Sequence, residues 1–173
     1  MKLNNRSDLF WATLGEGGLV LALGIVAWAT KQPVIFASLG PTAYELVEQP
    51  QLRSARSYNI IVGHLVGLAA GFAAVYVSGA WAAPDVLSSG FVSIPRLWAT
   101  TIAAGLTTFL TLILKAGQPA ALATTLLVSL GAMQSLRAAI AIILGVFIMA
   151  GLGEPLRQFR LKHTRLRATG SGT

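Results

Sequence analysis

Two prolines lie near the start of short apolar segments, and each follows small or polar residues. One lies in Ser38-Leu39-Gly40-Pro41-Thr42 and the other in Gly117-Gln118-Pro119. Proline suits the first turn of a helix, and a helix N-terminus carries free N–H groups and partial positive charge. Two converging N-termini would bind a small anion, helped by the Ser38 and Thr42 hydroxyls and the Gln118 amide. The alternative is that both prolines only kink packed helices.

Two ionisable side chains lie inside long apolar stretches, where charge is expensive and usually marks a function. His64, with Asn59 about one turn before it, is a candidate ligand or proton carrier, or else a neutral histidine bonded to a backbone carbonyl. Glu16 is a second candidate for proton coupling, or else faces a water-filled vestibule. The candidate substrate-binding residues are Ser38, Gly40, Pro41, Thr42, Asn59, His64, Gln118 and Pro119.

The composition excludes several classes of function. The chain has no cysteine and only two histidines, which excludes thiolate metal sites and cysteine nucleophiles, and we expect neither a metal nor a cofactor. It has no G-x-S-x-G, P-loop or H-E-x-x-H motif, so we expect no enzyme activity. Of the basic residues, five follow the last apolar stretch, which fits the positive-inside rule of membrane proteins better than nucleic-acid binding.

The hydropathy of the chain places these residues in a membrane. Of its 173 residues, 54% are hydrophobic and 11% are charged. Four apolar stretches each have nearly the length that crosses about 30 Å of hydrocarbon: Leu9 to Thr30, Tyr58 to Trp81, Leu97 to Leu114 and Leu136 to Leu156. We therefore expect an all-α, polytopic membrane helix bundle that forms a single domain over residues 1–173.

Two shorter apolar segments, Val34 to Val47 and Ala120 to Met133, would each make only about 20 Å of helix. The order long, short, long occurs twice along the chain, with Pro41 and Pro119 in corresponding places. This order predicts an internal repeat of four long transmembrane helices and two broken half helices. The first copy covers about residues 9–82, the second about 95–156, and a basic cytoplasmic tail covers 157–173.

The short segments either complete a crossing or return to the side on which they entered. If they cross, each half has three crossings and the halves are inverted; if they return, each half has two crossings and the halves are parallel. Crossing puts Arg53, Arg56 and Lys115 on the side of both termini and leaves three basic residues on the other side. Because this agrees better with the positive-inside rule, we expect inverted repeats with both termini in the cytoplasm.

Three motifs resemble those of the HPP family of small integral membrane proteins. Gly40-Pro41-Thr42-Ala43 resembles the family's Gly-Ala-Ser/Thr-Ala turn, apart from Pro41. Asn59, Gly63 and His64 match its Arg-Asn-x-x-x-Gly-His signature, with Tyr58 at the arginine position. Gly117-Gln118-Pro119-Ala120 resembles its His-Pro-Pro motif, of which the second proline and the alanine remain.

The resemblance implies a small-anion transporter in a bacterial inner membrane or its equivalent, because plant and cyanobacterial relatives are associated with nitrite transport. We expect nitrite as the first candidate substrate, alternating access as the mechanism and lipid as the surroundings. An anion channel would use the same residues without coupling. A non-transporting scaffold or assembly protein would instead use the basic tail and the glycine stripe of Gly63, Gly67 and Gly71, which we interpret as a packing surface and which leaves room for a homo-oligomer.

Overall fold

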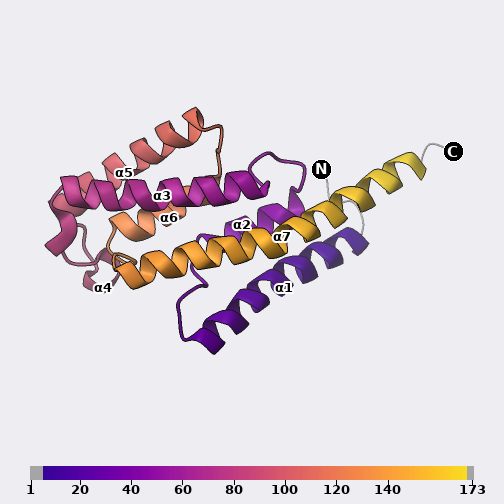
Figure 1. Ribbon diagram of the computed structural model, residues 1–173, viewed down its shortest axis with the longest axis horizontal. Coiled ribbons are helices and arrows are strands. Elements are labelled where there is room, and N and C mark those ends of the chain that lie inside the picture. Colours follow the sequence, from indigo (N-terminus) through magenta and orange to yellow (C-terminus); the bar gives the residue numbers. More distant parts are fainter. Residues whose placement is uncertain (1–5, 171–173) are drawn as a thin grey trace.

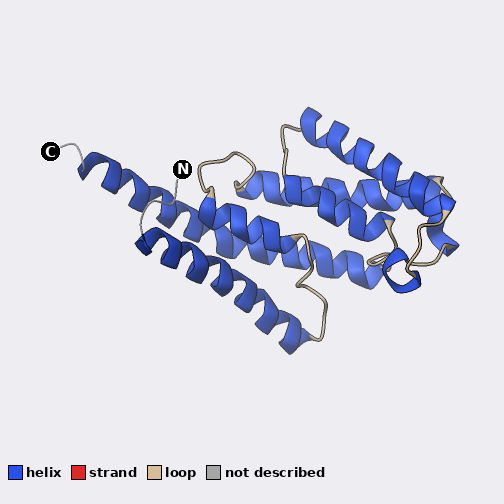
Figure 2. Cartoon of the chain, turned by 180° about the vertical axis from the view of Figure 1, so that it is seen from behind, coloured by secondary structure: helices blue, strands red, loops and turns tan. Residues whose placement is uncertain are grey.

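The computed structural model describes the backbone of residues 6–170 and the side chains of residues 8–162, and the described backbone is helical without a strand (Figures 1 and 2). The helices are α1 (Arg6–Thr30), α2 (Leu39–Glu48), α3 (Ser57–Val77), a 3-10 turn η1 (Ala80–Ala82), α4 (Val86–Ser89), α5 (Ile94–Ile113), α6 (Pro119–Ser129) and α7 (Leu136–Gly170). By length and composition, α1, α3, α5 and α7 can each cross a membrane. The predicted all-α polytopic bundle is confirmed.

Two of the long helices end at other residues than predicted. Helix α3 ends at Val77, before Trp81, because Gly79 takes a positive φ of 67° and turns the chain into η1. Helix α7 does not end at Leu156 but continues past Pro155 to Gly170. Hydropathy detects where apolar residues stop, whereas Leu, Arg, Gln and Lys continue a helix readily in water.

The direction of the chain reverses from each main helix to the next, in the order α1, α2, α3, α5, α6 and α7 (Figure 1). Helix α3 therefore runs parallel to α1, whereas a returning short segment between them would make the two antiparallel. The start of α1 and the end of α7 lie at one end of the bundle, which we call the terminal end (Figure 1). The loops that carry Arg53, Arg56 and Lys115 lie at this end too, as the three-crossing arrangement predicts.

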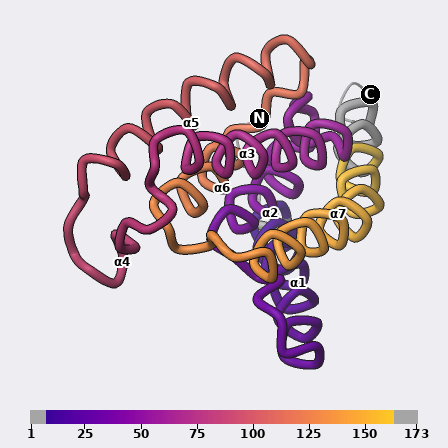
Figure 3. Tube along the Cα trace, turned by 60° about the vertical axis from the view of Figure 1, so that its left-hand side comes forward, coloured from indigo at the N-terminus to yellow at the C-terminus, as the bar shows by residue number. Residues whose placement is uncertain are grey.

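The helix contacts follow the same inversion. Helix α1 packs on α2 as α5 packs on α6, and α2 packs on α7 as α6 packs on α3. Helix α1 also contacts α7, as α5 contacts α3. The short helices α2 and α6 lie toward the middle, with the long helices around them (Figure 3). Each of these contacts thus has a counterpart when α1, α2 and α3 are exchanged for α5, α6 and α7. Together with the reversed helix directions, this supports an inverted internal repeat.

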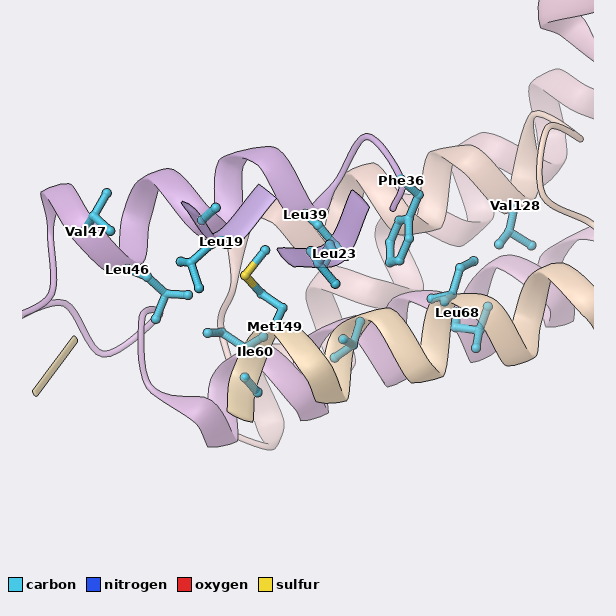
Figure 4. Packing of buried hydrophobic residues seen from close by; sticks show 14 residues of the cluster. Leu19, Leu23, Phe36, Leu39, Leu46, Val47, Ile60, Leu68, Val128 and Met149 are labelled. Carbon is cyan, nitrogen blue, oxygen red and sulfur yellow. The ribbon is translucent and has the colours of Figure 1, made fainter. Parts of the chain in front are cut away.

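A buried apolar cluster fixes α2 between α1 and α7 (Figure 4). Leu46 of α2, Ile60 of α3 and Met149 of α7 are fully buried in it. Lipid tails are as apolar as these side chains, so close van der Waals packing stabilises the cluster inside a membrane. Because the cluster holds α2 from several sides, the polar face of α2 stays directed toward α3 and α6.

Glycines let the short helices approach the long ones. A Cβ atom at Gly67 would lie 2.6 Å from the carbonyl oxygen of Ala121 in α6, and one at Gly145 of α7 would overlap the carbonyl oxygen of Val34. Cβ atoms at Gly63 and Gly71 would also contact α6. The stripe of Gly63, Gly67 and Gly71 is therefore a packing surface, as predicted. Because α6 covers it within the chain, a homo-oligomer would have to use another surface, and it stays a prediction.

Gly67→Ala is expected to destabilise the protein by about 1–3 kcal/mol, the usual cost of overpacking a close contact. The added methyl group would push α6 from α3, because the atom it meets belongs to backbone. Thermal unfolding of the detergent-solubilised protein measures the effect. Gly105→Ala on α5 is the matched control, since a Cβ there meets nothing within 4 Å. Equal unfolding temperatures for the two variants would contradict the close packing at Gly67.

Candidate functional site

A network of fully buried polar side chains joins α2, α3 and α6. The Oγ1 atom of Thr124 lies 2.7 Å from Oγ of Ser38 and 2.7 Å from Nδ1 of His64. The Nε2 atom of His64 lies 3.1 Å from Oγ1 of Thr42, which donates to the backbone carbonyl of Ser38 at 3.1 Å. All four residues have a relative exposure of 0%. The contacts therefore form a closed ring that we call the histidine network.

The number of hydroxyl and ring N–H donors in the histidine network favours one tautomer of His64. If Thr42 gives its only hydroxyl hydrogen to the Ser38 carbonyl, it must accept from Nε2–H of His64. Nδ1 is then an acceptor for the Thr124 hydroxyl, and Thr124 accepts from the Ser38 hydroxyl. Every polar atom of the ring has a partner in this arrangement, and His64 is neutral. A hydrogen on Nδ1 would instead draw the Thr42 hydroxyl to Nε2 and leave the Ser38 carbonyl without that bond.

Helix α3 holds the turn that precedes α6. The side-chain nitrogen of Asn59 donates to the carbonyl oxygens of Lys115 at 3.4 Å and Gly117 at 3.2 Å. Gln118 is the N-cap of α6, because its Oε1 accepts from the backbone N–H of Ala120 at 3.2 Å, and Pro119 is the first helical residue. Asn59 thus positions the start of α6 instead of sharing contacts with His64.

The amide nitrogen of Gln118 is a buried donor without a hydrogen-bond partner among the described residues. The whole residue is only 4% exposed. A buried donor without a partner costs about 1–3 kcal/mol. It lies at the helix end where free backbone N–H groups add positive potential.

Two cavities flank the start of α6. The larger, about 530 Å³, lies between α5, α6 and the loop that joins α2 to α3, and Arg53, Thr111, Gln118 and Pro119 are among its lining residues. We call it the α5–α6 cavity. The smaller, about 190 Å³, is lined by α2 and the start of α6 and contains Glu45, which accepts a hydrogen bond from Ser54. Arg53 thus lines the cavity on one side of the α6 N-terminus, and Glu45 lines the cavity on the other side.

The N-termini of α2 and α6 do not converge on one site, contrary to the expectation. The helices lie side by side, because Ser38 at the start of α2 bonds Thr124, six residues beyond Gln118. That offset is about 9 Å at a rise of about 1.5 Å per residue. Ser38, Thr42 and His64 therefore form one group, while Asn59, Gln118 and Pro119 form another at the terminal end.

Three predicted site residues belong to neither group. Pro41 is exposed and lines the smaller cavity beside Pro119. A Cβ at Gly40 would meet nothing within 4 Å, so no close contact requires glycine there. Glu16 of α1 is partly exposed, and no hydrogen bond or ion pair links it to any side chain that the structure describes. Its part in proton coupling stays a prediction.

Arginines bond to the C-terminal ends of both short helices. Arg96 is only 2% exposed, and it donates to the carbonyl of Ser129, the last residue of α6, at 3.1 Å. It also donates to the carbonyls of Pro84 and Ala83 and to the side chain of Gln134. Arg160 of α7 donates to the carbonyl of Val47 near the end of α2 at 3.2 Å. These contacts compensate the negative ends of the helix dipoles and leave the positive ends inside the bundle.

Thr124 is the central residue of the histidine network, yet it is not among the predicted site residues. The sequence contains one signal for it, since Thr124 and Thr125 place two hydroxyls in an otherwise apolar segment. A hydroxyl can bond its own helix, so this signal does not specify a partner. Thr125 bonds the carbonyl of Ala121 and also lies 2.8 Å from the hydroxyl of Thr107 in α5, and Thr124 bonds across to α2 and α3.

A family model described as "HPP, transmembrane region" matches residues 1–163 of the chain. No curated protein and no solved structure matches the chain. The three motifs that resemble the family meet in space, although they lie far apart in the sequence. Thr42 of the first motif contacts His64 of the second, and Asn59 of the second holds Gly117 of the third.

Proposed function

The chain belongs to the HPP family of transmembrane proteins, and we propose that it transports a small inorganic anion, with nitrite as the first candidate. One observation carries the proposal: the buried, unpartnered amide of Gln118 lies at the N-terminus of α6, beside a cavity of about 530 Å³. Donors without an acceptor inside an apolar bundle attract an anion. Nitrite is the anion that the family resemblance implies.

The distribution of basic residues supports entry from the terminal end. The α5–α6 cavity lies at that end, where Arg53, Arg56 and Lys115 occupy the connecting loops. Basic loops face the cytoplasm in most multi-pass membrane proteins. We therefore assign the terminal end, with both termini, to the cytoplasmic side of the inner membrane and the cavity to the cytoplasmic entrance.

The inverted halves support alternating access. In transporters with inverted repeats, the site lies where broken helices of the two halves meet, and one half moves against the other. Here the histidine network connects the broken helices about 9 Å deeper along α6 than Gln118. We propose that the anion passes from the cavity to the opposite end through the histidine network, which would require Ser38 to separate from Thr124 and His64 to be freed. His64 is therefore our first candidate for proton coupling, and Glu16 of α1 is the second.

Nitrite uptake into proteoliposomes tests the function. Chloride, nitrate and formate serve as competitors, a pH gradient is applied or collapsed, and protein-free liposomes correct for nitrous acid that crosses the lipid unaided. Saturable uptake that follows the pH gradient supports a coupled transporter. Uptake that ignores the gradient supports a channel. Absence of flux for every anion would reject transport and favour the scaffold, for which the basic tail remains as a surface because α6 covers the glycine stripe.

A further inference from the structure

We propose that Arg53 is a substrate-binding residue of the α5–α6 cavity and that it makes the site select planar oxyanions over halides. The inference rests on the proposed function, because it names the class of anion that the same site takes. Arg53 is the basic residue of the cavity lining, and among the residues that the structure describes no acidic one lines it.

The side chain of Arg53 is available to a ligand. Its backbone carbonyl closes a turn by accepting from the N–H of Arg56 at 3.1 Å, and within the described part of the chain its side chain has no hydrogen bond or ion pair. Arg96 and Arg137 use their side chains to bond carbonyl oxygens, and Arg157 bonds Glu154. Arg53 and Arg56 lie in one loop without a side-chain bond among the described residues, and of these two Arg53 lines the cavity.

The cavity combines two complementary sources of positive potential. The guanidinium belongs to the loop between α2 and α3, and the second source is the start of α6 with Gln118. Glu45, which would repel an anion, lines the other cavity and is bonded by Ser54. A volume of about 530 Å³ accommodates a small anion with part of its hydration shell, since one water takes up about 30 Å³.

Guanidinium geometry determines the class of anion. Its planar fork presents two parallel N–H groups, which bond two oxygens of one oxyanion at once. Nitrite, nitrate and formate each offer two oxygens in one plane, whereas chloride is a single sphere. Arg53→Lys keeps the charge and loses the fork, so it separates selectivity from simple attraction.

The test measures anion binding and flux on the same variants. Binding is followed by the anion-dependent shift in thermal unfolding of the purified protein, and flux by the concentration dependence of uptake into proteoliposomes. In Arg53→Gln the half-saturating nitrite concentration is expected to rise at least about tenfold. In Arg53→Lys the preference for nitrite over chloride is expected to fall about fivefold or more. Arg56→Gln is the matched control, because Arg56 lies exposed in the same loop but does not line the cavity.

Each outcome separates the inference from the transport proposal. Equal effects of Arg53→Gln and Arg56→Gln would overturn the inference, and so would a wild-type protein that binds chloride as well as nitrite. Saturable wild-type flux with an unaltered Arg53→Gln variant overturns the inference alone. Nitrite binding that depends on Arg53, in a protein without flux, upholds the inference and rejects transport. Absence of both binding and flux rejects both.

Discussion

Gln118→Glu is expected to reduce nitrite flux about 100- to 1,000-fold at alkaline pH, once the introduced carboxyl has lost its proton. The variant keeps an oxygen for the backbone N–H of Ala120, so the cap of α6 is preserved. It replaces the unpartnered amide donor with a negatively charged oxygen. Two like charges about 4 Å apart repel by about 4 kcal/mol at an effective dielectric constant of about 20, and about 1.4 kcal/mol corresponds to tenfold.

The pH dependence of the Gln118→Glu variant has a definite sign. As the pH falls and the introduced carboxyl gains a proton, the repulsion disappears and an O–H donor replaces the lost amide. Part of the flux should therefore return, measured as uptake above that of protein-free liposomes at each pH. Gln51→Glu introduces the same charge at an exposed position in the nearby loop, outside both cavities. Wild-type flux in a folded Gln118→Glu protein, or an equal loss in Gln51→Glu, would remove Gln118 from the proposed site.

Thr124→Val is expected to lower the free energy of unfolding by about 2–4 kcal/mol. Valine matches threonine closely in shape, so packing is largely kept while the hydroxyl is lost. Oγ of Ser38 and Nδ1 of His64 both lose the partner that they contact at 2.7 Å. Each buried polar atom without a partner costs about 1–3 kcal/mol. Denaturant titration of the protein in mixed micelles measures the change.

A double-mutant cycle identifies the network as the cause of that loss. Thr124→Val combined with His64→Leu should cost at least about 1 kcal/mol less than the sum of the single changes, because residues of one hydrogen-bond network couple. Thr101→Val is the control, since the hydroxyl of Thr101 is exposed and bonds only its own helix at Leu97. Additive costs would contradict the network. Full flux in a folded Thr124→Val protein would limit the network to a structural role.

The membrane-spanning elements could be predicted from the sequence, because partition into lipid depends on the apolar character of about 20 consecutive residues and not on their partners. The stretch from Leu9 to Thr30 matches α1, which covers Arg6–Thr30, and Leu97 to Leu114 matches α5, which covers Ile94–Ile113. The inverted direction of the halves could be predicted too. The bias in basic residues is a property of whole loops, so the sequence shows it without knowledge of any contact.

The contacts of the candidate site depend on the tertiary structure. In the histidine network, Thr124 bonds residues that are 60 and 86 positions away in the sequence. Whether two side chains meet depends on the rotation and axial offset of their helices, and one residue along a helix turns the side chain by about 100°. Hydropathy does not encode that offset, which results from close contacts such as that of Gly67 with Ala121.

The sequence by itself therefore determined the class of protein, the order and inverted direction of its helices, and the broken starts of α2 and α6, since each follows from local composition. Only the tertiary structure decided that these N-termini lie side by side instead of meeting, that Thr124 completes the network around His64, and that Arg96 is buried against the end of α6. The physical reason is that apolar character acts on each segment alone, whereas a hydrogen bond needs two groups that packing has brought within about 3 Å.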